Sequence, residues 1–194
     1  MPEPFSLCVF CGASSAVDQT HLQLAQEVGR TAAKRGMTIV FGGGRVGLMG
    51  HMADSALDHG GHVVGIIPQH LEDWEVGHQG TSEYHVVDSM HTRKKMMFDR
   101  SDAFCVLPGG LGTLDETFEM ITWKQLKLHS KPIILLNYNN YWDPLLMLID
   151  HQVRNGYMHG SVEQLVTIAE SCDQVFDLLS TKVKENRLGA SVLT

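Results

Sequence analysis

The stretch LPGGLGTLDETFEMITW, residues 107–123, combines glycines and acidic residues at a spacing that could support chemistry. Gly109, Gly110 and Gly112 follow an apolar run, and Glu116 comes shortly after them, where a helical pattern begins. Glycines let the backbone approach an anion closely, and the amides and dipole at a helix N-terminus favour negative charge. The stretch therefore predicts a phosphate-sized anion site with a carboxylate close behind it.

The same stretch also has a purely structural interpretation. Thr113 followed three residues later by Glu116 forms a capping box, which would satisfy the first amides of a helix without any ligand. The lysine and spacing of a Walker A loop are missing, so a triphosphate is not implied. Apolar residues at helical spacing predict a core-facing stripe, namely Leu114, Phe118, Ile121 and Leu128. On this segment alone, the anion site and the capped helix are equally good interpretations.

A basic pair follows another predicted strand. Residues 86–100, VVDSMHTRKKMMFDR, predict a helix with Asp88 or Ser89 as its N-cap. Arg93 and Lys94 lie on one face of this helix, and taken alone they indicate a solvated basic surface. Beside a glycine cradle, however, a guanidinium and an ammonium could hold a phosphate and leave the carboxylate for chemistry.

The elements that must position these residues follow an alternating pattern of short apolar runs and longer amphipathic ones. Seven runs predict strands, the last of them weakly: residues 6–12, 37–42, 62–68, 84–88, 102–108, 131–137 and 164–170. Their continuous Val, Ile and Leu content is typical of parallel strands buried on both faces. We therefore expect a Rossmann-like, doubly wound α/β fold with a parallel sheet of six or seven strands, in a single domain over residues 1–194. Ligands of such sheets bind beyond the carboxyl ends of the strands.

Helices are predicted at residues 18–35, 143–155 and about 173–184. Asp143 is the expected N-cap of the second, with Pro144 at its first position. The tail, residues 185–194, has no clear period and is expected to fray. Residues 69–82 are expected to form one long irregular connection, and such connections are often functional.

A second glycine turn, FGGGRVGLMG, comes after the second predicted strand. Gly42, Gly44 and Gly47 match the pattern G-x-G-x-x-G. The next predicted strand ends in Pro68 without an acidic residue placed to hold a ribose, so a dinucleotide oxidoreductase is disfavoured. Close packing of a helix on the sheet explains Gly47 and Gly50 at least as well as contact with a ligand.

Composition and charge exclude several classes of protein. The chain has 194 residues, 43% of them hydrophobic, with a formal net charge of -7 and a sequence pI near 5.8. A mild acidic excess argues against a nucleic-acid or anionic-membrane partner, which would select for clustered Lys and Arg. No basic leader opens the chain, and no run approaches the roughly 20 apolar residues of a membrane span. We expect a cytoplasmic protein.

Cys8 and Cys11 form a C-x-x-C pair inside the first predicted strand. Their odd separation sends the two side chains to opposite faces of the sheet, and no second cysteine pair completes a zinc site. We interpret them as buried small hydrophobes. None of the eleven histidines lies in a ligand motif, so no metal is expected.

Several motifs together resemble the LONELY GUY (LOG) family, the cytokinin riboside 5'-monophosphate phosphoribohydrolases often mislabelled as lysine decarboxylases. They are FGGGRVGLMG, VVDSMHTRKK, LPGGLGTLDE and TWKQLKLHSKPIILLN, and the resemblance runs from FCGASS to about Tyr157. The combination of P-G-G-x-G-T-x-x-E with M-x-x-R-K is highly specific. The resemblance implies hydrolysis of the N-glycosidic bond of AMP or N6-isopentenyl-AMP, which releases the free base and ribose 5-phosphate without a cofactor.

The resemblance also implies roles for particular residues. Arg93 and Glu116 would be the catalytic pair. The 5'-phosphate would bind to Gly109, Gly110, Gly112 and Thr113. The substrate site would further include Lys94, Glu75 and Thr122. This chain departs from the family pattern at Asp115, where many relatives have Glu, and around Glu75, where the match is looser.

A homodimer is a further implication of the resemblance. Methionines at 90, 96 and 97 could contribute to its interface, and ordinary core packing is the alternative for them. Two other functions stay open. A non-catalytic nucleotide or molybdenum-cofactor carrier on the same fold would have no need of Arg93 and Glu116 together. A pyridoxal-phosphate-dependent lysine decarboxylase would need a Schiff-base lysine, and only Lys94 and Lys95 lie near the predicted site.

Overall fold

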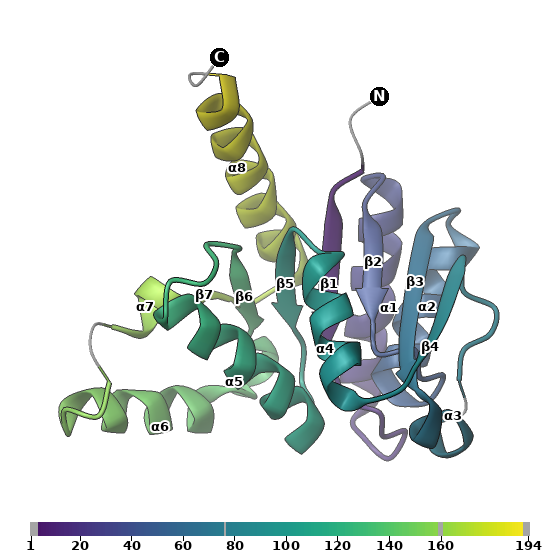
Figure 1. Cartoon of the computed structure of the whole chain (residues 1–194), viewed down its shortest axis with the longest axis horizontal. Coiled ribbons are helices and arrows are strands. Elements are labelled where there is room, and N and C mark those ends of the chain that lie inside the picture. The colour runs from purple at the N-terminus through teal and green to yellow at the C-terminus, as the bar shows by residue number, and fades with distance from the viewer. Residues whose placement is uncertain (1–3, 76, 159–160, 192–194) are drawn as a thin grey trace.

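The protein is built around one parallel β-sheet (Figure 1). The computed structural model describes residues 4–75, 77–158 and 161–191. The strands are β1 (Ser6–Phe10), β2 (Thr38–Phe41), β3 (His62–Pro68), β4 (Glu83–Val87), β5 (Ala103–Val106), β6 (Ile133–Leu136) and β7 (Thr167–Ala169). Their order is β4-β3-β2-β1-β5-β6-β7, and each neighbouring pair is parallel. Each predicted strand has a counterpart, but the last is shorter than predicted: residues 164 and 165 are helical, and β7 covers only three residues. The Rossmann-like class of the fold is confirmed.

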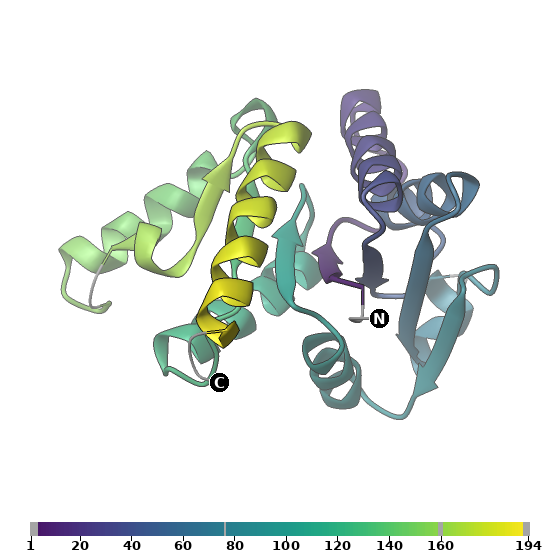
Figure 2. The same cartoon turned by 90° about the horizontal axis from the view of Figure 1, so that it is seen from above.

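Helices cover both faces of the sheet. They are α1 (Gln19–Lys34), α2 (Gly47–Asp58), α3 (Gln69–Glu75), α4 (Met90–Asp99), α5 (Leu111–Gln125), α6 (Asp143–Arg154), α7 (Val162–Leu165) and α8 (Cys172–Ser191), with a 3₁₀ turn, η1 (Tyr138–Asn140), before α6. Helices α1, α2 and α8 share one hydrophobic core with the sheet, and α4, α5 and α6 share the other. Figure 2 shows α1 and α4 on opposite sides of the strands. Within the described residues, no helix is both long and apolar enough to cross a bilayer.

Strand β1 shows how the sequence divides between the two cores. Leu7 and Val9 belong to the core under α1, whereas Cys8 and Phe10 belong to the core under α4. This alternation follows from the two-residue period of a strand. Cys11, just past the strand, joins the α1 side, so the prediction that Cys8 and Cys11 face opposite cores is confirmed.

Helix boundaries differ from the prediction at α6. Trp142, and not Asp143, is the N-cap, and Pro144 stands in the first turn after Asp143. The side chain of Asn137 explains the shift: its Oδ1 accepts from the amide of Trp142 at 2.7 Å, and its Nδ2 donates to Asp143 Oδ1 at 2.8 Å. An asparagine at the end of β6 therefore organises this helix start.

Three other expectations are corrected. Helix α8 extends past Lys184 to Ser191, because Glu, Arg, Leu and Ala in this tail are strong helix formers; residues 192–194 lie outside the described part. The connection after β3 is helical over α3. Leu128 does not complete the stripe of α5, because the helix ends at Gln125 and Leu128 is exposed.

Candidate active site

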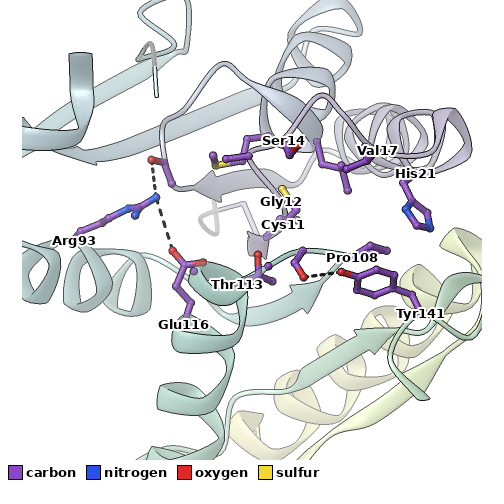
Figure 3. Close-up of a pocket in the computed structure, with 18 residues that line it drawn as sticks. Cys11, Gly12, Ser14, Val17, His21, Arg93, Pro108, Thr113, Glu116 and Tyr141 are labelled. Carbon is purple, nitrogen blue, oxygen red and sulfur yellow. Dashed lines mark hydrogen bonds and ion pairs between the residues drawn. The ribbon is translucent and has the colours of Figure 1, made fainter. Parts of the chain in front are cut away.

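A cavity of about 570 Å³ opens at the carboxyl ends of β1, β2 and β5 (Figure 3). From β1 the chain proceeds through β2, β3 and β4 toward one edge of the sheet, and it then returns to form β5 on the other side of β1. This reversal of strand order is the topological switch point where open α/β sheets bind ligands. Both glycine turns and the turn after β1 contribute to the lining.

Arg93 and Glu116 face one another at one end of this cavity. Their side chains are only 6% and 10% exposed, and Arg93 Nη2 lies 3.8 Å from Glu116 Oε1. The guanidinium is oriented by two backbone carbonyls, because its Nε donates to Ile66 O at 3.2 Å and its Nη2 to Gly42 O at 3.0 Å. A Cβ on Gly42 would lie 2.0 Å from Nη2, so only glycine leaves room for this arginine. An always-charged group is thus fixed beside a buried carboxylate.

The start of α5 decides between the two interpretations of residues 107–123. The helix begins at Leu111, with Gly110 as its N-cap and no side chain capping it. The predicted capping box is therefore wrong, because Thr113 lies inside the first turn, where its hydroxyl cannot take the N-cap position. The first amides of a helix have no acceptor within the helix. Here they are available to an anion, which favours the anion-site interpretation.

Neither the backbone conformation nor side-chain packing requires glycine at positions 110 and 112. A Cβ at either residue would have no heavy atom within 4 Å, and neither has a positive φ. Gly109 differs, because its Cβ would lie 2.1 Å from Thr113 Oγ1. Packing requires the first glycine, while the other two leave open space in front of the amides, as a bound phosphate would need.

The turn after β1 joins the two glycine turns. Gly12 donates its amide to Pro108 O at 3.0 Å, and its carbonyl accepts from the amide of Leu48 at 3.0 Å. A Cβ on Gly47 would lie 2.6 Å from the backbone of Ser14, and one on Gly50 would lie 1.9 Å from a backbone carbonyl. Close backbone contact therefore explains both glycines, but the contacts are with the turn after β1 and with Arg45 and not, as predicted, with the sheet.

Two of the remaining predicted site residues, Lys94 and Thr122, are not among the described residues that line the cavity. Lys94 Nζ instead contacts Asp115 Oδ2 at 3.1 Å and Glu119 Oε2 at 3.0 Å. Burial alone would lower the pKa of Lys94, but the hydrogen bonds with Glu119 and Asp115 outweigh it and raise that pKa. Thr122 is exposed on α5. Glu75 ends α3, and its side chain lies outside the described residues.

Cysteine and metal chemistry receive no support from the described residues. Cys8 and Cys11 are both buried thiols, and burial, followed by the charge of Glu116, raises the pKa of each well above its usual value. Within the described part of the chain, no group of three or more His, Cys, Asp or Glu side chains is arranged to hold a metal ion.

Several cavity residues were missed by the sequence analysis, namely Gly12, Ser14, His21 and Tyr141. A signal existed for the first two, because glycine and serine directly after a predicted strand end are typical of a ligand-binding turn. His21 lies in α1 and Tyr141 lies between η1 and α6. Neither stands in a recognisable motif, and only the fold brings them to the cavity.

The fold and the cavity define an α/β protein of the Rossmann-like class with a candidate anion site beside a buried carboxylate. The profile of a family described as "Possible lysine decarboxylase" matches residues 49–179. A cytokinin riboside 5'-monophosphate phosphoribohydrolase of Rhodococcoides fascians is 44% identical over 89% of this chain and 87% of its own. The Arabidopsis thaliana enzyme of that name, LOG2, is 39% identical over 93% of this chain and 84% of its own. The chain therefore belongs to the LONELY GUY family, as its motifs predicted.

Solved structures confirm the fold alone. The molybdenum cofactor binding protein of Rippkaea orientalis superposes with a TM-score of 0.72 over 94% of this chain and 99% of its own, at 22% identity. A carrier protein for the same cofactor from Chlamydomonas reinhardtii gives 0.71 at 18% identity, again over 94% and 99% of the two chains.

Proposed function

We propose that this protein hydrolyses the N-glycosidic bond of AMP or N6-isopentenyl-AMP and releases the free base and ribose 5-phosphate. The observation that carries the proposal is the position of Glu116, a buried carboxylate that lines the same cavity as the start of α5. The names of relatives at 38–44% identity, which specify a cytokinin riboside 5'-monophosphate, support the N6-modified nucleotide as a substrate.

The proposed mechanism assigns a separate task to each end of the cavity. Amides at the start of α5 hold the 5'-phosphate, together with Gly109, Gly110, Gly112 and Thr113. Glu116 stabilises the positive charge that develops at C1'. It also takes a proton from a water molecule while the oxygen of that water forms a bond to C1'. The bond between C1' and the base nitrogen breaks, and the base leaves with its electron pair and takes a proton from solvent. Glu116 returns its proton to solvent, so that one water molecule is consumed in total.

Arg93 supports this chemistry without taking a proton. Its guanidinium is fixed by Gly42 O and Ile66 O, so its positive charge stays beside Glu116 and the reacting centre. We propose that it keeps Glu116 oriented and balances charge on the departing base. Lys94 then supports α5 through Asp115 and Glu119 without contacting the substrate.

The test of this function is the detection of free base by chromatography after incubation with AMP, N6-isopentenyl-AMP or adenosine. We expect release from the two nucleotides and much slower release from adenosine, which has no phosphate for the start of α5 to hold. The ratio of the two nucleotide rates gives the preference of the enzyme. No release from either nucleotide would contradict the proposal.

Two alternatives are weaker. A cofactor carrier resembles this chain in fold only, at 22% identity or less among the carrier structures compared; tight pterin-cofactor binding without base release would support it. A lysine decarboxylase needs a lysine in the cavity, and none of the described lining residues is one. An absorbance change on addition of pyridoxal phosphate would be required to revive it.

We also propose a single-domain, cytoplasmic protein that assembles as a homodimer. The methionines at 96 and 97 belong with the core, because Met97 is 1% exposed and Met96 packs on the same cluster. Support for a dimer comes from large apolar side chains left exposed on or just after α5 and α6: Leu126, Leu128, Met147 and Leu148. Light scattering should give twice the monomer mass, and a monomer would contradict this part of the proposal.

A further inference from the structure

Tyr141 is fixed at the end of the cavity opposite Arg93 (Figure 3). Its hydroxyl donates to Gly109 O at 2.8 Å. His21 and Trp142 form T-shaped contacts with its ring, with centroids 5.5 and 4.8 Å away and the ring planes nearly perpendicular. The hydroxyl is therefore presented to the glycine turn by a ring that has contacts on two sides.

We infer that Tyr141 is a positioning residue for the phosphate site, which fixes the peptide between Gly109 and Gly110 so that its amide points in one direction. This inference rests on the proposed function, since it concerns the phosphate end of the same cavity. It assigns Tyr141 no contact with the reacting atoms.

Peptide geometry connects the hydroxyl to the amide. No peptide bond among the described residues is cis, so the C=O of Gly109 and the N–H of Gly110 point in opposite directions from one planar unit. A donor that holds the carbonyl therefore also sets the direction of the amide. The preceding peptide is held in the same way, because the amide of Gly12 donates to Pro108 O at 3.0 Å. Two consecutive peptides of the glycine turn are thus held by hydrogen bonds from two other segments, the turn after β1 and the segment between η1 and α6.

Glycine needs such anchors more than any other residue. Adjacent glycines sample a wide range of φ and ψ, and ordering them costs more entropy than ordering other residues. A Cβ on Gly110 in particular would meet no heavy atom of the described residues within 4 Å, so side-chain packing does not restrict this residue. Without the Tyr141 hydroxyl, the turn would have to be ordered by the phosphate itself, at the expense of binding affinity.

Tyr138 provides a matched control. Its ring also packs edge-on against His21, at 6.1 Å, but it is not among the lining residues. Replacing either tyrosine with phenylalanine keeps the ring and removes only the hydroxyl. The two variants thus distinguish the bond to Gly109 from the aromatic packing.

The experiment is calorimetric titration of ribose 5-phosphate and of adenosine into the wild type, Tyr141→Phe and Tyr138→Phe. Loss of a hydrogen bond of ordinary strength predicts about three- to tenfold weaker binding of ribose 5-phosphate by Tyr141→Phe, with adenosine binding unchanged and Tm slightly lowered. Tyr138→Phe should match the wild type. In turnover, KM for AMP should rise by a similar factor for Tyr141→Phe at constant kcat.

Two results would overturn the inference. Wild-type affinity of Tyr141→Phe for ribose 5-phosphate would remove any role of the hydroxyl in phosphate binding. An equal loss for ribose 5-phosphate and adenosine would indicate a general structural effect. Failure of the proposed function is a distinct result, because the wild type itself would then neither bind ribose 5-phosphate nor release base, and the inference would fail with it.

Discussion

Two arginine–carboxylate pairs lie at opposite ends of α4 and differ in almost every physical respect. Arg93, in the first turn, is buried with Glu116 at 3.8 Å, beyond hydrogen-bond distance. Arg100, the C-cap, is 38% exposed and contacts Glu83 at 2.6 Å. The shorter pair is thus the exposed one, where water screens the charges and the contact contributes little to stability.

The two ion pairs differ in the other hydrogen bonds that their members make. The guanidinium of Arg93 donates to two backbone carbonyls that hold it in place near Glu116. Glu83 instead accepts from the side chains of His62, at 3.0 Å, and His85, at 3.1 Å, as well as from Arg100. The first pair is positioned by the fold around a cavity, whereas the second is a surface cluster of mutually satisfied side chains. Short distance alone is therefore a poor guide to function.

Removal of each arginine should give the largest contrast. Arg93→Met leaves the buried charge of Glu116 without its guanidinium and should lower the free energy of unfolding by about 3–5 kcal/mol. Arg100→Met should lower it by about 0–1 kcal/mol, as is usual for exposed pairs. Urea denaturation measures both values. Equal losses would contradict the distinction between the pairs.

Gly42→Ala tests whether the backbone positions Arg93. The new Cβ would meet Nη2 at 2.0 Å, so the guanidinium must move or the turn must shift, at a cost of about 1–3 kcal/mol. Steady-state kinetics should show a fall in kcat/KM for base release that, expressed as a free energy, is at least as large as the loss in the free energy of unfolding measured by urea denaturation. Unchanged turnover would show that the orientation of Arg93 is irrelevant.

Gly112→Ala separates a structural glycine from a ligand-binding one. A Cβ here meets nothing within 4 Å, and alanine in a helix is favoured over glycine by roughly 0.5–1 kcal/mol. Stability should therefore be unchanged or higher, while ribose 5-phosphate binding weakens because the methyl group occupies the open space. Calorimetry measures this binding. If Gly112→Ala bound ribose 5-phosphate as tightly as the wild type does, the phosphate would not lie at this position.

The smallest effect should be the pH dependence contributed by Glu83. Hydrogen bonds from His62, Arg100 and His85, in that order, lower its pKa from 4.5 to about 2. A depressed folded-state pKa contributes stability above the unfolded value, and this contribution is lost as pH falls from about 4.5 toward 2. Because Glu83 is 39% exposed, the effect should be small. The stability difference between the wild type and Glu83→Gln should therefore shrink between pH 6 and pH 3, as followed by thermal denaturation.

Much of the fold could be predicted from the sequence, because buried parallel strands have a simple signature. Continuous apolar runs separated by amphipathic segments gave all seven strands, including the short β7. Helix ends were harder to predict, since they depend on tertiary partners such as the side chain of Asn137 at the start of α6.

The candidate site was predictable where its residues stand in motifs. Arg93 and Glu116 come from segments whose spacing already indicated chemistry, and the structure brings them together. The capping box was misleading, because the same Thr and Glu pattern occurs one turn into a helix that starts earlier. Tyr141 had no local signal, since its position beside Gly109 depends on β6 lying next to β5.

The most direct test of the central claim, that Glu116 performs the chemistry, is kcat/KM for base release from N6-isopentenyl-AMP in matched variants. Glu116→Gln should lose a factor of about 10²–10⁴ while binding ribose 5-phosphate as the wild type does. Glu119→Gln alters a carboxylate one turn along α5 that contacts Lys94 and does not line the cavity, and it should stay near the wild-type rate. Near wild-type hydrolysis by Glu116→Gln would contradict the claim and remove this carboxylate from the mechanism.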